Sequence, residues 1–218
     1  MVSKMASLDL VEFVETNILP LYAAFDKAHG LAHVTSVIRR SVALAVAVGA
    51  DVDMAYTVAA YHDLGMSGPR AIHHITGGKI LARDARLKRW FSQEQIKVMK
   101  EAVEDHRASA SHAPRSIYGK IVAEADRDLD VETVLRRTVQ FGLAHYPQLG
   151  KEQQWQRFRE HIDNKYSSSG YIKLWIPGSD NERKLNELRV CIADISQLRK
   201  IFDRLYAEES GGNIAGRP

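Results

Sequence analysis

The stretch MAYTVAAYHDLGM, residues 54–66, decides the expected fold and chemistry of this chain. The residues before His62 are mostly small and apolar, which predicts a helix that runs through the core. An ionised carboxylate at its end, such as Asp63, is costly unless it is paired, hydrogen-bonded or bound to metal. Imidazole and carboxylate are common ligands of divalent metals. His62 and Asp63 are therefore candidate metal ligands, although backbone capping is the simpler alternative for the two residues taken alone.

Several further segments carry ligand-type residues beside apolar stretches with helical periodicity. In DKAHGLAHV, residues 26–34, His29 and His33 are four positions apart and share a helix face, so either could serve as a ligand. The fold would have to bring several helices together to form one site. The candidates in chain order are His29, His33, His73, His74, His106 and Asp126.

The order of His33, then His62-Asp63, then Asp126 resembles the HD-domain superfamily of metal-dependent phosphohydrolases, whose pattern is a His, a His-Asp pair and a distant Asp. The resemblance covers residues 29 to about 130. It implies that these four residues hold a divalent metal with one or two positions left open. It also implies that a water activated by the metal attacks phosphorus.

Several branches of the superfamily add two histidines, the first within an H-x-x-x-G stretch that ends in Ile-Leu. His73 fits that spacing, with Gly77 four residues on and Ile80–Leu81 beyond, and His106 fits the second position. His74 is the neighbour that has to be excluded, because adjacent helical residues point about 100° apart. The spacing from the glycine favours His73.

The resemblance implies a cofactor of one or two divalent ions, drawn from Mn, Fe, Mg, Ni, Co or Zn. With two ions, Asp63 would bridge them, and His73 and His106 would bind the second. With one ion, these histidines would hydrogen-bond phosphate or protonate the leaving group. Asp63, His73 and His106 are therefore the predicted catalytic residues.

Some residues depart from better-known branches of the superfamily. RASASH follows His106 where cyclic dinucleotide phosphodiesterases have Gly-Tyr-Pro, and LGMSGPR follows the His-Asp pair where alarmone hydrolases place Glu-Asp. Both activities are disfavoured. Met66 stands where binuclear branches often have lysine, so the charge that faces phosphate has to come from elsewhere. The candidates for this role are Arg70, Arg107, Arg115 and Lys120.

The chain is expected to be all-α, a multi-helix bundle in which metal ligands converge from several helices. Helix start signals recur: Asp51 or Asp53 before the core helix, a capping box of Ser92 and Gln95, and Asp130 further on. We expect an HD core with N-terminal helices over residues 1–146. A helical appendage packed on that core is expected over 147–210, with a disordered tail over 211–218.

The 218 residues, 45% hydrophobic and 26% charged, have the composition of a soluble globular protein. The formal charge of +3 is modest and the basic residues are scattered, so nucleic acid is not an expected partner. No apolar run approaches the roughly 20 residues that span a bilayer, and the amino terminus lacks the order of a signal peptide. We therefore expect a cytoplasmic protein without a membrane partner. The single cysteine, Cys191, excludes an intramolecular disulfide and lies in a predicted helix core.

The favoured function is a metal-dependent phosphohydrolase whose partner is a nucleotide or another small phosphorylated metabolite. Two alternatives stay open. The first is a metal-stabilised module that senses a ligand or binds a partner with little turnover, and the second is a di-iron oxygenase. The sequence does not indicate the oligomeric state.

Overall fold

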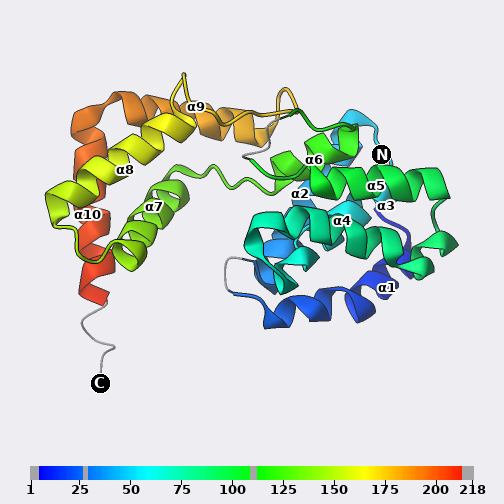
Figure 1. The fold of residues 1–218 in the computed structure, drawn as a ribbon. Coiled ribbons are helices and arrows are strands. Elements are labelled where there is room, and N and C mark those ends of the chain that lie inside the picture. Colours follow the sequence, from blue (N-terminus) through cyan, green and yellow to red (C-terminus); the bar gives the residue numbers. More distant parts are fainter. Residues whose placement is uncertain (1–4, 27–28, 109–111, 213–218) are drawn as a thin grey trace. The chain divides into compact units, whose positions relative to one another are not determined.

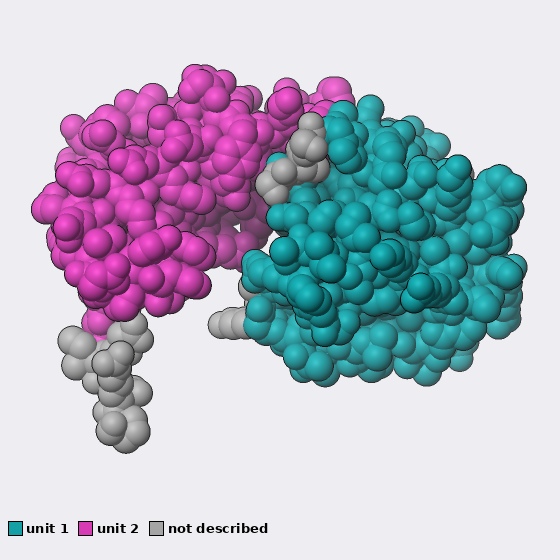
Figure 2. Space-filling view, viewed as in Figure 1, with its two compact units in different colours: residues 1–127 teal, residues 128–218 magenta. Residues whose placement is uncertain are grey.

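The computed structural model describes residues 5–26, 29–108 and 112–212. Within these ranges the chain forms helices and no strand (Figure 1). The predicted all-α fold is confirmed. The helices form two compact units, residues 1–127 and 128–218, which Figure 2 colours separately. Each unit is described by itself.

The first unit contains six α-helices and four short 3₁₀ helices among its described residues. In chain order they are α1 (Leu8–Asn17), η1 (Leu19–Ala24), α2 (Leu31–Val48), α3 (Val52–Tyr61), η2 (Leu64–Ser67), η3 (Arg70–Ile72), α4 (His73–Arg83), η4 (Ala85–Arg89), α5 (Gln93–Glu104) and α6 (Ile117–Ala125).

Helix α3 is the central helix of this unit. All its residues except Asp53 are buried, as expected of a helix that is apolar on every side. It packs against α1, α2, α4, α5 and α6. Its first turn is capped by Asp51, whose carboxylate accepts the amide of Met54 at 3.1 Å. The prediction of a helix through the core, opened by Asp51 or Asp53, is confirmed.

The start of α4 approaches the end of α3 without intervening side chains, because glycines lie at the contact. A Cβ atom at Gly65 would overlap the carbonyl oxygen of His73, and one at Gly77 would lie 3.1 Å from the carbonyl oxygen of His62. Backbone cannot move aside as a flexible side chain can. The two glycines therefore allow the first turn of α4 to lie directly against the His-Asp pair, which explains the spacing between His73 and Gly77.

The capping box predicted for α5 is present. The amide of Gln95 donates to the hydroxyl of Ser92 at 3.3 Å, and the side chain of Gln95 accepts the Ser92 amide at 2.9 Å. Helix α5 packs along α4 and also contacts α3 and α6. Its end therefore lies among the same helices that surround the His-Asp pair.

Helix α2 is long and apolar enough to cross a membrane by length and composition alone. Arg39 and Arg40 lie at its middle, however, where charges in a bilayer are costly. Its buried positions recur every three or four residues and the helix packs against α3 and α6. We therefore interpret α2 as a helix that packs one face on the core of the first unit; the cytoplasmic location stays a prediction.

The second unit consists of four helices among its described residues: α7 (Val131–His145), α8 (Lys151–Tyr166), α9 (Asp180–Ala193) and α10 (Ile195–Gly212). Asp130 caps α7 as predicted and accepts the amide of Thr133 at 2.9 Å. The core includes Trp155, Phe158 and Phe202, whose rings lie 5.2 to 5.8 Å apart. Cys191 is buried in α9.

The division between the units precedes α7, whereas the sequence suggested a boundary after residue 146. The buried face of α7 packs against α8 and α10, so this helix belongs with the C-terminal unit. Of the predicted tail 211–218, Gly211 and Gly212 end α10, and the remaining residues lie outside those that the structure describes.

Candidate metal centre

His62 lies at the carboxyl end of α3 and is fully buried. The last carbonyls of a helix have no amide partner within the helix. The carbonyl of Ala59 is one of these, and His62 Nδ1 donates to it at 2.8 Å. A carbonyl only accepts, so Nδ1 carries the proton and the lone pair of a neutral His62 lies on Nε2.

Two other histidines are held in the same way. His106 Nδ1 donates to the carbonyl of Val103 at 2.6 Å, and His73 Nδ1 donates to the carbonyl of Arg70 at 2.7 Å. In each case the carbonyl lies three residues earlier, in the turn that precedes the histidine. A backbone partner of this kind orients an imidazole and leaves Nε2 as its metal-binding atom.

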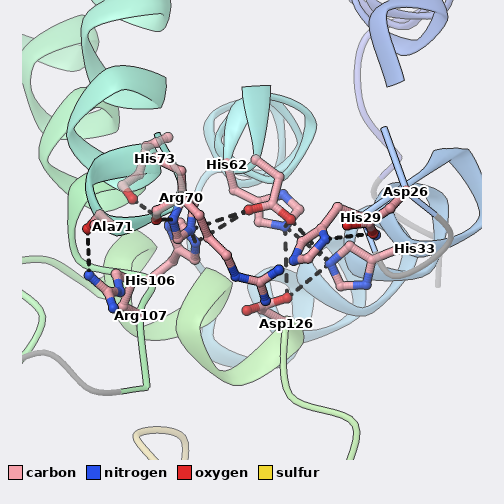
Figure 3. A network of polar contacts seen from close by, with 12 residues as sticks. Asp26, His29, His33, His62, Arg70, Ala71, His73, His106, Arg107 and Asp126 are labelled. Atoms are coloured by element: carbon pink, nitrogen blue, oxygen red, sulfur yellow. Dashed lines mark hydrogen bonds and ion pairs between the residues drawn. The ribbon is translucent and has the colours of Figure 1, made fainter. Parts of the chain in front are cut away.

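The first cluster consists of His33, His62, Asp63 and Asp126, which come from α2, the end of α3 and the end of α6 (Figure 3). The Nε2 atoms of His33 and His62 lie 3.3 Å apart. Asp63 Oδ2 lies 3.6 Å from the first and 3.3 Å from the second. Asp126 Oδ1 lies 3.1 and 3.7 Å from the same two nitrogens.

The second cluster consists of Asp63, His73 and His106. The Nε2 atoms of His73 and His106 lie 3.1 Å apart. Asp63 Oδ1 lies 3.5 Å from His73 Nε2 and 3.6 Å from His106 Nε2. Asp63 is therefore shared, with one oxygen facing each cluster.

The donor atoms of His33, His62 and Asp63, and those of Asp63, His73 and His106, are close enough together to hold a divalent cation, and Asp126 borders the first group. Ligand atoms that bind one ion at 2.0–2.2 Å lie about 3.0–3.6 Å from one another, close to the separations in both clusters. In the second cluster the protons of His73 and His106 are engaged on Nδ1, so two lone pairs and a carboxylate oxygen face one another. A proton or a metal ion between them would remove this repulsion.

Residues 30–129 match the family model of the HD domain. This part of the chain is similar to the HD domain. Its match includes every residue of the two clusters and lies almost entirely within the first unit. No curated protein sequence matches the chain.

Two solved structures resemble the chain. One is YpgQ of Bacillus subtilis in complex with ADP, with 20% identity, a TM-score of 0.55, and coverage of 88% of this chain and 95% of that one. The other is a predicted HD superfamily hydrolase from an uncultured Thermotogales bacterium, with 18% identity, a TM-score of 0.49, and coverage of 74% and 91%. At such identity the likeness to YpgQ concerns the fold.

His29 and His74, the alternative candidates, lie outside the two clusters. His29 Nδ1 lies 2.9 Å from the carboxylate of Asp26, and Figure 3 shows its ring between Asp26 and the first cluster. His74 has its Nδ1 buried without a hydrogen-bond partner among the described residues. Burial and the nearby charge of Arg107 lower the pKa of His74 to about 4. The structure thus brings His33 and His73 to the clusters.

The four candidates for phosphate binding differ in their surroundings. Arg115 is bound through Nε and Nη2 to the buried carboxylate of Asp105, and Nη2 also contacts Glu104 at 2.9 Å. Its charge is therefore already neutralised, which argues against a role in phosphate binding. Arg107 donates to the carbonyl of Ala71 at 2.9 Å and so ties the residue after His106 to η3.

The side chain of Arg70 is exposed and extends from η3 toward the clusters in Figure 3. Lys120 lies on α6, and its side chain has no hydrogen bond or ion pair with another described residue. Arg70 and Lys120 therefore remain available to an anion. Of the two, Arg70 lies on the segment whose carbonyl orients His73, so it is the better placed.

The charges of the site are strongly coupled. Burial alone would lower the pKa of His62, but the negative charges of Asp63 and Asp126 outweigh it and raise this pKa to about 9. Burial would raise the pKa of Asp63, yet His62 and His106 hold it well below its usual range. Burial also lowers the pKa of His73. Without metal, the site therefore holds ionised carboxylates beside a protonated His62.

Sequence reasoning missed Tyr22, a fully buried residue of η1 whose hydroxyl contacts the backbone on both sides of His62. Burial and the charge of Asp63 raise the pKa of Tyr22 well above its usual range, so its hydroxyl stays protonated. No motif marks a tyrosine that acts through backbone contacts. Sequence reasoning also assigned no role to Asp26, the partner of His29, although Asp26 lies three residues before His29 in the sequence.

Asp63→Ala is expected to weaken Mn²⁺ binding more than about 100-fold, because outer partners of metal ligands alone account for about 10–100-fold and Asp63 serves both clusters. His74→Ala is the matched control and should bind Mn²⁺ as the wild type does. Equilibrium dialysis with elemental analysis measures both, and circular dichroism checks the helical fold. Unchanged metal content in Asp63→Ala would refute the assignment.

Metal affinity should also depend on pH through His62. Its raised pKa means that a metal ion has to displace a proton below about pH 9. The apparent affinity for Mn²⁺ should therefore rise by about tenfold per pH unit between pH 6.5 and 8.5 and then level off near pH 9. Titration calorimetry in two buffers of different ionisation enthalpy also counts the released proton. A flat affinity without proton release would contradict this charge assignment.

Proposed function

We propose that the protein is a metal-dependent phosphohydrolase that acts on a nucleotide or another small phosphorylated metabolite. The observation that carries the proposal is the shared carboxylate, Asp63, whose two oxygens each face imidazole Nε2 atoms of a different cluster. His33, His62, Asp63 and Asp126 would hold one ion, and Asp63, His73 and His106 would hold a second if two are bound. The match of residues 30–129 to the HD-domain model supports the same reaction class.

A divalent ion bound there would supply an activated water and would screen the charge of the phosphate oxygens. The residues of the chain would hold the cation and bind the phosphate group. Asp63 and Asp126 provide negative charge that retains the cation, and His73 and His106 complete the second cluster next to the substrate. Arg70 provides a positive charge for the phosphate group.

The contrast between His29 and the cluster histidines indicates a different role for His29. Its Nδ1 faces the carboxylate of Asp26, whereas His62, His73 and His106 donate to neutral carbonyls. An imidazole that is hydrogen-bonded through Nδ1 to a carboxylate can transfer a proton from Nε2 in general acid catalysis. In the proposed mechanism, His29 donates that proton to the leaving oxygen.

The hydrolysis step forms one bond to phosphorus and breaks another. The water oxygen forms a bond to phosphorus while the bond from phosphorus to the leaving oxygen breaks. The electron pair of that bond stays on the leaving oxygen, which takes the Nε2 proton of His29. The proton lost by the attacking water passes to solvent, and His29 regains a proton from solvent.

ADP in the structure of YpgQ supports the choice of nucleotides as the first compounds to test. A modest positive charge on the protein also suits an anionic substrate. The alternative of a ligand-sensing module would bind metal and a phosphorylated ligand without turnover. A broad substrate screen therefore separates the two functions.

The first experiment on function is hydrolysis in isotopically labelled water. The metal-loaded protein is expected to hydrolyse a phosphate ester or anhydride from a panel of nucleotides and aryl phosphates, with loss of activity on chelation. The solvent oxygen should appear in the phosphorus-containing product, as measured by mass spectrometry. Label found only in the alcohol would rule out attack on phosphorus, and absence of turnover across the panel would favour the sensing module.

The second experiment tests His29 with two esters of matched shape, phenyl phosphate and p-nitrophenyl phosphate. In His29→Gln, kcat for phenyl phosphate should fall by about 100-fold or more, the lower range for loss of a general acid. The value for p-nitrophenyl phosphate should fall less than about tenfold, because its acidic leaving group needs little protonation. His74→Gln is the control. Equal losses on both esters, or loss of bound metal, would exclude the proton-donor role.

A further inference from the structure

Tyr22 belongs to η1 and precedes residue 30, where the match to the HD family begins. Its side chain is fully buried in the first unit. The hydroxyl donates to the carbonyl of Ala60 at 2.9 Å and accepts the amide of Asp63 at 3.4 Å. One phenol oxygen therefore contacts the backbone on both sides of His62.

These contacts fall where α3 ends and its regular hydrogen bonding stops. The carbonyls of Ala59 and Ala60 belong to the last turn and lack amide partners within the helix. His62 Nδ1 donates to the first and Tyr22 to the second. Both free carbonyls are thus bound by side chains, and the backbone that carries Asp63 is fixed from two directions.

The orientation of the Asp63 side chain affects both clusters, whereas the orientation of each other ligand affects only one. Its two oxygens lie 3.3 Å from His62 Nε2 and 3.5 Å from His73 Nε2, one in each cluster. A rotation of the backbone at this residue would displace both oxygens at once. A contact that fixes the Asp63 peptide therefore acts on both clusters.

We propose that Tyr22 is a positioning residue of the metal centre, which holds the turn from Ala60 to Asp63 so that Asp63 presents one oxygen to each cluster. The segment before the HD match then belongs functionally to the site. The inference rests only on the metal-binding part of the proposed function and does not depend on the substrate.

Tyr61 provides a matched control within the same unit. It is also fully buried, and its hydroxyl donates to Asp84 Oδ2 at 2.7 Å. Asp84 caps η4 and belongs to neither cluster. Tyr61→Phe therefore removes a buried tyrosine hydrogen bond and leaves both contacts of Tyr22, with Ala60 and with Asp63, in place.

The test compares Mn²⁺ affinity of the full chain in Tyr22→Phe, Tyr61→Phe and the wild type, by competition with a chelating dye. The dissociation constant should rise about 10–100-fold in Tyr22→Phe, the range for lost outer partners of metal ligands. It should change less than about threefold in Tyr61→Phe, although both variants lower the melting temperature of the metal-free protein. Unchanged affinity in Tyr22→Phe, or equal weakening in both variants, would overturn the proposal.

A chain with 4-aminophenylalanine at position 22 covers the case in which Tyr22→Phe does not fold. This residue keeps the ring and a donor to Ala60, so it should bind Mn²⁺ within about threefold of the wild type, well inside the loss expected without that donor. Binding weakened tenfold or more there would count against the proposal. A wild-type protein that binds no Mn²⁺ would overturn the proposed metal centre as a whole, whereas failure in Tyr22→Phe alone overturns only the role of Tyr22.

Discussion

The structure of the first unit depends on one electrostatic constraint, which is the buried negative charge of Asp63. A carboxylate without partners in an apolar core would cost several kcal/mol (about 3–5 when one partner of a buried ion pair is lost). Here imidazole nitrogens lie on both sides of it, within 3.3 to 3.6 Å. The helices that bring those imidazoles together are the ones that surround α3. The same helix packing therefore forms the core of the unit and places the imidazoles around the carboxylate of Asp63.

A repeated local arrangement places the imidazoles. Three histidines donate from Nδ1 to a carbonyl three residues earlier, so the groups left free at a helix end orient the ligands. Glycines at positions 65 and 77 then allow the backbone of α4 to lie close to the end of α3. Local hydrogen bonding sets the direction of each ring, and the glycine contacts set the distance between the rings.

Much of this could be predicted from the sequence. The apolar run before His62 predicts the buried helix, and the ordered histidines and aspartates predict which helices converge. Tyr22 could not be predicted, because it acts on backbone atoms through the fold and leaves no spacing signal. The Arg115 ion pair with Asp105 could not be predicted either, since scattered arginines look alike until their partners are known. The boundary before α7 depends on packing against α8 and α10, which helical periodicity alone does not reveal.

The most direct test of the central claim is an anomalous difference map from crystals of the protein loaded with Mn²⁺. The account predicts density beside Asp63, with one peak among His33, His62 and Asp126. When both clusters are filled, a second peak should lie between the other Asp63 oxygen and the nitrogens of His73 and His106. Density that avoids Asp63, or a map without a peak at either cluster in Mn²⁺-saturated crystals, would contradict the account.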